Sequence, residues 1–77
     1  MAVDRMTETI TRNPAVLGGQ PYIVGTEITV TTVLDLLAEG VFPQEIVAEK
    51  YLPQLKLDHI YTCIAFASQT LRALKWD

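Results

Sequence analysis

The pattern of apolar positions changes its period part-way along the chain. Over residues 10–29, β-branched residues stand among glycines and prolines, a mixture typical of short strands joined by tight turns. Gly25-Thr26 predicts a turn that pairs residues 22–24 with residues 27–29. We therefore expect a small β-hairpin at this end of the chain.

Helical spacing begins at Val30. From there, apolar residues fall at i, i+3, i+4, i+7 and i+11, which are Val30, Val33, Leu34, Leu37 and Val41. This spacing predicts an amphipathic helix over about 31–39. Its N-cap would be Thr31 or Thr32, and Gly40 supplies the left-handed position that ends it.

Two further helices follow. Pro43 and Glu45 suit a first helical turn, which predicts a helix over about 43–50. Its inward residues would be Ile46, Val47 and Tyr51. A third, longer helix is predicted over about 57–75, and its inward stripe would consist of Leu57, Ile60, Tyr61, Ile64, Ser68 and Leu71.

The expected fold class is therefore mainly α with a small N-terminal β-hairpin. Three helices with a tight turn between the first two resemble a helix-turn-helix unit. Residues 1–9 are polar, and we expect a flexible N-terminus there, followed by one domain over residues 10–77.

Hydrophobic content points to a partner. Of the 77 residues, 49% are hydrophobic, although a chain of this size buries only about 60% of its surface. The surplus predicts an exposed apolar patch and a homo-oligomer, most simply a homodimer. Phe42, Leu74 and Trp76 are the candidate interface residues; the alternative is that they fold back onto the domain's own core.

Charge and cysteine content set further bounds. The net charge is −3, and no Lys or Arg stands between Arg12 and Lys50, which is unusual for a DNA-binding domain. The single cysteine, Cys63, excludes an internal disulfide and fits a cytoplasmic location. No apolar run approaches the length of a membrane span, so a membrane partner is not expected.

The sequence contains no evident set of catalytic residues. His59 is the only histidine, and no pair of carboxylates has a reason to converge. His59 and Cys63 could share a helix face, but two ligands without a second pair are weak evidence for a metal. We therefore expect a non-enzymatic protein with no catalytic residue, metal, cofactor or small-molecule substrate.

The glycines and prolines of the hairpin carry a family resemblance. The residues that match are Pro14, Gly18, Gly19, Pro21, Ile23, Gly25, Thr26 and Ile28. Their spacing resembles bacterial domain-of-unknown-function family 433, described as VapB-type antitoxin-like, over roughly residues 10–67. The resemblance implies a winged-helix or homeodomain-like fold. It also implies a DNA-binding antitoxin, encoded beside a PIN-like ribonuclease toxin, with the third helix as the recognition helix.

The chain departs from the family pattern in its charges and caps. Gln20, Val24 and Glu27 stand where the family usually has basic residues, and Phe42 and Lys56 stand where it tends to place Ser or Thr. The hairpin therefore keeps its turns but loses its positive charges. Neither Phe42 nor Lys56 has a side chain that can accept a capping bond.

Two functions remain open on the sequence. The first is an antitoxin-like autoregulator that binds its promoter DNA and neutralises a PIN-like ribonuclease toxin. Its candidate DNA-contacting residues are Arg12, Lys50, Lys56, His59, Tyr61 and Thr62, and we expect DNA contact only from a dimer or a toxin-bound complex. The alternative is a protein–protein interaction or assembly module of the same fold without DNA binding.

Overall fold

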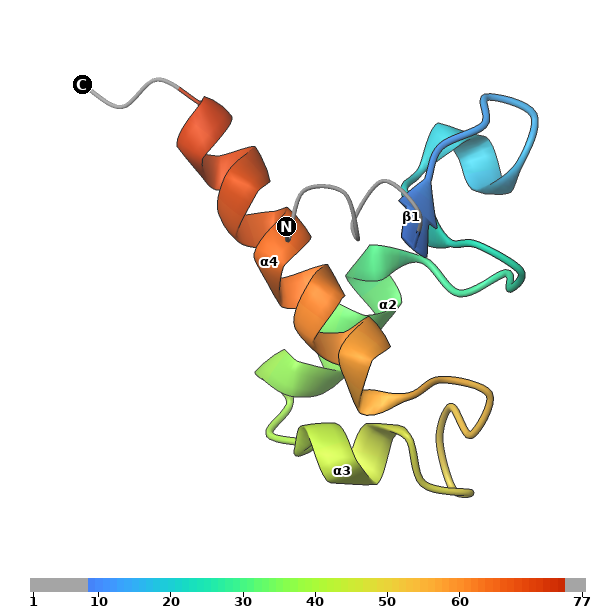
Figure 1. The fold of residues 1–77 in the computed structure, drawn as a ribbon, viewed down its shortest axis with the longest axis vertical. Coiled ribbons are helices and arrows are strands. Elements are labelled where there is room, and N and C mark those ends of the chain that lie inside the picture. The colour runs from blue at the N-terminus through green and yellow to red at the C-terminus, as the bar shows by residue number, and fades with distance from the viewer. Residues whose placement is uncertain (1–8, 75–77) are drawn as a thin grey trace.

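A computed structural model describes residues 9–74 of the chain. The elements are the strand β1 (Ile10–Thr11), the 3-10 helix η1 (Leu17–Gly19), the strand β2 (Tyr22–Ile23), and the helices α2 (Val30–Ala38), α3 (Pro43–Ile46) and α4 (Leu57–Ala73). The expected fold class is confirmed: the described chain is mainly helical with a small antiparallel hairpin near its N-terminus. Figure 1 shows α4 running along the molecule, with the hairpin and α3 toward opposite ends and α2 between them.

The hairpin uses both edges of β2. Ile10 and Thr11 pair antiparallel with Ile23 and Tyr22, a pairing that the sequence pattern did not predict. On the other edge, Tyr22 bridges Thr29. The expected pairing of residues 22–24 with 27–29 is therefore present, reduced to one bridge and the hydrogen bond from the Ile23 N–H to the Ile28 carbonyl (2.9 Å).

The turn at Gly25-Thr26 lies where the sequence predicts it. Gly25 has φ +83°, a left-handed conformation that side chains disfavour. The Thr26 hydroxyl donates to the Ile23 carbonyl (2.8 Å) and accepts from the Ile28 N–H (3.0 Å). One side chain thus satisfies backbone groups on both arms of the turn.

Helix α2 begins one residue earlier than expected and has a different cap. Thr29, rather than Thr31 or Thr32, is its N-cap, and the Thr29 hydroxyl accepts from the Thr32 N–H (3.1 Å). The reason is that pairing with Tyr22 holds Thr29 extended, with φ −78° and ψ 156°, which is the conformation of an N-cap. Gly40, at φ +95°, ends the helix as expected, and the Val41 N–H donates back to the Leu36 carbonyl (3.1 Å).

Helix α3 is shorter than the predicted 43–50. It ends after one turn, and the Leu52 N–H donates to the Ile46 carbonyl (2.8 Å). Ile46 is fully buried and Val47 half-buried, as expected, but Tyr51 is 43% exposed. The inward placement of Tyr51 requires a continuous helix, and the early end of α3 removes that periodicity. Leu55 is buried instead.

The predicted inward stripe of α4 is wrong in part: Ile60 is buried and Leu57 and Ser68 are half-buried, but its other three residues are exposed. Ile60 and Cys63 are fully buried, whereas Tyr61, Ile64 and Leu71 are 52%, 40% and 52% exposed. The helix is rotated so that the Ile60–Cys63 side packs on the core. Spacing alone could not decide between the two sides, because α4 carries apolar or small residues on both.

The core joins the hairpin to all three helices. Its buried residues are Ile10, Ile23, Ile28, Val30, Val33, Ile46, Leu55, Ile60 and Cys63. Among the described residues, none that is buried is polar or charged. An isolated two-stranded hairpin is marginally stable in water, so its three buried isoleucines depend on the helices for their burial.

Candidate interaction surface

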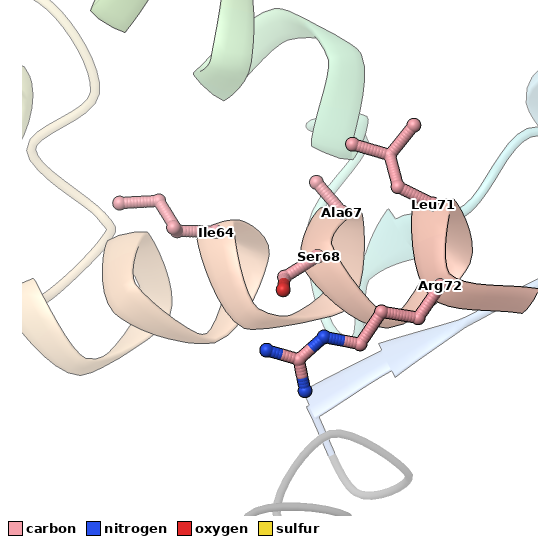
Figure 2. Close-up of a pocket in the computed structure, with 5 residues that line it drawn as sticks. All are labelled: Ile64, Ala67, Ser68, Leu71 and Arg72. Atoms are coloured by element: carbon pink, nitrogen blue, oxygen red, sulfur yellow. The ribbon is translucent and has the colours of Figure 1, made fainter. Parts of the chain in front are cut away.

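One side of α4 carries several exposed apolar residues. Tyr61, Ile64 and Leu71 are among the exposed large hydrophobic residues, and Leu74, at the C-cap of the helix, is 53% exposed. A surface groove of about 600 Å³ is lined by Ile64, Ala67, Ser68, Leu71 and Arg72. Figure 2 shows Ala67 and Leu71 pointing to one side of α4, and Ser68 and Arg72 pointing to the other.

Four residues on this side of α4 have the spacing of a coiled-coil seam. Tyr61, Ile64, Ser68 and Leu71, here called the outer seam, alternate spacings of three and four residues. Half-buried Leu57 continues the same pattern toward the start of α4. A seam of this spacing faces another helix when two helices pack along their length. Figure 1 shows the last turns of α4 extending past α2 and away from the hairpin.

The residues of the hairpin signature serve the backbone and the core. Gly18 and Gly19 have positive φ, as does Leu17 before them. The Pro21 carbonyl accepts from the Val30 N–H (3.0 Å) and so joins the hairpin to α2. Ile23 and Ile28 are buried. Pro14 is exposed, and its Cα lies 3.8 Å from the place that a side-chain carbon on Gly19 would occupy.

The comparisons with known proteins agree with this signature. The family model described as "Protein of unknown function (DUF433)" matches residues 10–67. The chain belongs to the DUF433 family. No curated protein and no solved structure matches it significantly. The match covers the hairpin, α2, α3 and the first part of α4, and it ends before Ser68, Leu71 and Leu74.

In this DUF433 domain, the cations expected to contact DNA are dispersed. Arg12 follows β1, and its Nε donates to the Gly19 carbonyl (3.2 Å). Lys50 lies in the loop after α3, and Lys56 is the N-cap of α4; both are exposed. The hairpin and the α3–α4 loop lie at opposite ends of the molecule in Figure 1. The structure therefore places Lys50 and Lys56 on one loop and leaves Arg12 away from them.

The remaining predicted DNA contacts have other roles in the structure. His59 Nδ1 accepts from the Lys56 N–H (2.9 Å), so the imidazole caps the start of α4. The Thr62 hydroxyl donates to the Asp58 carbonyl (2.8 Å), which uses its proton within the helix. Tyr61 belongs to the outer seam. The same kind of cap lies at the start of α3, where Glu45 Oε1 accepts from the Phe42 N–H (2.9 Å).

The predicted interface residues fall in different places. Leu74 lies at the end of α4, close in sequence to the outer seam, whereas Phe42 is 69% exposed at the start of α3. Trp76 lies outside the described residues. The helical period assigns Ile64, Ser68 and Leu71 to the core, because alternating spacings of three and four residues describe an inward stripe and an exposed stripe equally well.

Cys63 lies on the core side of α4. Burial raises the pKa of the Cys63 thiol from 9.0 to about 11, because the charged thiolate is disfavoured away from water. The thiol therefore stays protonated and behaves as a small apolar side chain. Within residues 9–74, no three His, Cys, Asp or Glu side chains gather as a metal site would require. No helix of that part of the chain is long and apolar enough to cross a membrane.

Proposed function

We propose that this DUF433 chain is a non-enzymatic protein–protein interaction module that binds a partner helix through the outer seam of α4. The observation that carries the proposal is the exposure of Tyr61, Ile64 and Leu71 along one side of a 17-residue helix. Exposed apolar patches of this kind mark interaction sites. An antitoxin that covers a toxin's active site would need such a surface.

The exposed apolar residues of the outer seam are too few to drive association by themselves. Full burial of one large apolar side chain contributes about 1.5–3 kcal/mol, so covering the exposed half of each of three contributes roughly 1 kcal/mol apiece. Association itself costs at least about 4 kcal/mol. The outer seam therefore supplies the apolar centre of an interface, and contacts from flanking residues such as Arg72 and Leu74 must complete it.

Site-specific photocrosslinking tests the proposal. Benzoylphenylalanine would replace Ile64 or Leu71 in cells that express the chain at its natural level. Gln69 provides the matched control on the same helix, because it is exposed and lies about 100° around the helix axis from Ser68. We expect protein adducts from positions 64 and 71 and none from position 69. Equal yields at the three positions, or no adduct at any of them, would contradict the proposal.

DNA binding is a second proposal, supported by one observation. Lys50 and Lys56 are both exposed and lie on the loop that leads into α4, where the free N–H groups of the helix also attract phosphate. The test is a titration of the promoter DNA at two salt concentrations. If these lysines contact phosphates, Lys50→Gln and Lys56→Gln should each reduce the salt slope by about 1. Absence of binding by the chain, alone or with the product of the neighbouring gene, would refute this proposal.

A further inference from the structure

We infer that the helix bound by the outer seam is α4 of a second copy of this chain, packed antiparallel. The inference rests on the proposed function and names the partner of that site. It is carried by the positions of two charged residues that flank the seam, Asp58 in the first turn of α4 and Arg72 in the last.

The outer seam fits an antiparallel copy of itself. When two identical helices pack antiparallel about the level of residue 66, Tyr61 of one copy lies beside Leu71 of the other, and Ile64 lies beside Ser68 of the other. Both contacts occur twice, as a two-fold interface requires. Each large side chain thus meets a partner across the axis.

Small residues lie where the two helices come closest. Ala65 and Ala67 stand on the two flanks of the seam near residue 66, and both are half-buried. Short side chains let helix axes approach toward the lower end of the usual range of about 8–10 Å. A close approach at the centre lets the larger residues on either side interdigitate.

Charge decides between the two orientations. Asp58 and Arg72 are 14 residues apart, which is two heptads or about 21 Å along the helix, and they lie on the same flank of the seam. In an antiparallel pair, equivalent flanks face each other, so Asp58 of each copy faces Arg72 of the other. A parallel pair brings opposite flanks together and leaves these charges apart.

Both charges are available for such a contact. Asp58 and Arg72 are exposed, and neither forms an ion pair with another residue of the described chain. The antiparallel arrangement also sets the negative end of one helix dipole beside the positive end of the other. The family match ends at residue 67, so family membership does not itself imply this pairing, which needs Leu71 and Arg72.

Complementary charge reversal tests the inference. Asp58→Arg places like charges opposite each other in both ion pairs of the homodimer, and so does Arg72→Asp. Each variant alone should dimerise about tenfold more weakly than wild type. An equimolar mixture should recover wild-type affinity through heterodimers, because the arginine introduced at position 58 of one copy then faces the aspartate introduced at position 72 of the other. The remaining pair of that heterodimer keeps its natural charges. Sedimentation velocity and native mass spectrometry measure both quantities.

The outcomes separate this inference from the proposed function. Gln69→Arg is the control charge change on α4 and should leave dimerisation unchanged, and circular dichroism melts check that each variant is folded. A wild-type chain that stays monomeric, or a mixture no tighter than the single variants, overturns the antiparallel homodimer. If crosslinks from position 64 then join a different protein, the proposed function stands; if no seam-specific crosslink forms, both are refuted.

Discussion

We predict that removing the hydroxyl of Thr26 destabilises the hairpin. Replacing Thr26 with Val keeps the branched shape and removes one oxygen. Two hydrogen bonds are lost, the one donated to the Ile23 carbonyl and the one accepted from the Ile28 N–H. The Ile23 carbonyl still accepts from the Thr26 N–H (3.0 Å). The Ile28 N–H, in a residue that is 8% exposed, is left without its acceptor.

The expected cost follows from the difference between these two backbone groups, of which only the Ile28 N–H loses its partner. An unsatisfied buried donor costs about 1–3 kcal/mol, and a typical hydrogen bond contributes about 1 kcal/mol net. Because Thr26 is only part-buried, we expect Thr26→Val to lower the free energy of unfolding by about 2 kcal/mol. For a domain of this size, that corresponds to a Tm lower by about 8–16 °C.

Thr26→Ser is the matched control. It keeps the hydroxyl and loses one methyl group, so it should cost about 0.5 kcal/mol, because full burial of such a group contributes about 0.8 kcal/mol. Urea unfolding followed by circular dichroism gives the free energy of each variant under one set of conditions. Equal stabilities of the Val and Ser variants would refute the role assigned to the hydroxyl.

Three further predictions concern the turn, a cap and the thiol. Gly25→Ala should cost about 1–2 kcal/mol because of the left-handed φ at this position; a steric clash is not the cause, because no heavy atom lies within 4 Å of the added carbon. D-alanine at this position in a synthetic chain should therefore restore stability, and a failure to restore it would point to a steric cause. His59→Ala should lower the free energy of unfolding by about 1 kcal/mol by removing the acceptor for the Lys56 N–H, while His59→Gln should lose less; equal losses would argue against the cap. Burial raises the pKa of Cys63 from 9.0 to about 11, so above pH 9 the folded state holds a proton that the unfolded state releases. The contribution of Cys63 to stability should therefore be constant below pH 9 and fall as the pH rises toward 11. Urea midpoints measured across that range should show this fall in the wild type and a smaller fall in Cys63→Ala. An identical fall in the wild type and in the variant would assign the pH dependence to other groups.

Local chemistry made much of the fold predictable. Pro43, Gly40 and Gly25 mark helix starts, helix ends and turns through backbone constraints that act whatever surrounds them. The elements they bound lie close to their predicted places. The strand at Ile10–Thr11 was missed because its partner residues Ile23 and Tyr22 lie 13 and 11 positions away along the chain, and pairing over that distance depends on tertiary packing rather than on local pattern.

The candidate site was harder to predict for a related reason. Whether Ile64 or Cys63 faces the core depends on how α4 rotates against α2 and α3, and its period fits both choices. The large share of apolar residues in the chain pointed to a partner surface but could not place it. Phe42 and Leu74, offered by the sequence as interface residues, are both exposed, while the seam residues were assigned to the interior because they form a stripe.

The wholly apolar core has a consequence for mutational tolerance. With no buried polar or charged residue in the described part of the chain, no side-chain hydrogen bond inside the core dictates which side chains must meet. Cores of this kind accept exchange among apolar residues of similar volume. The information that fixes one topology then lies at the boundary, in the left-handed turns, in the turn hydrogen bonds of Thr26 and in the helix caps made by Thr29 and His59. In a randomised library, substitutions at Val33 or Ile46 within the apolar class should survive selection for folding more often than changes at Gly25 or changes at Thr26 that remove its hydroxyl.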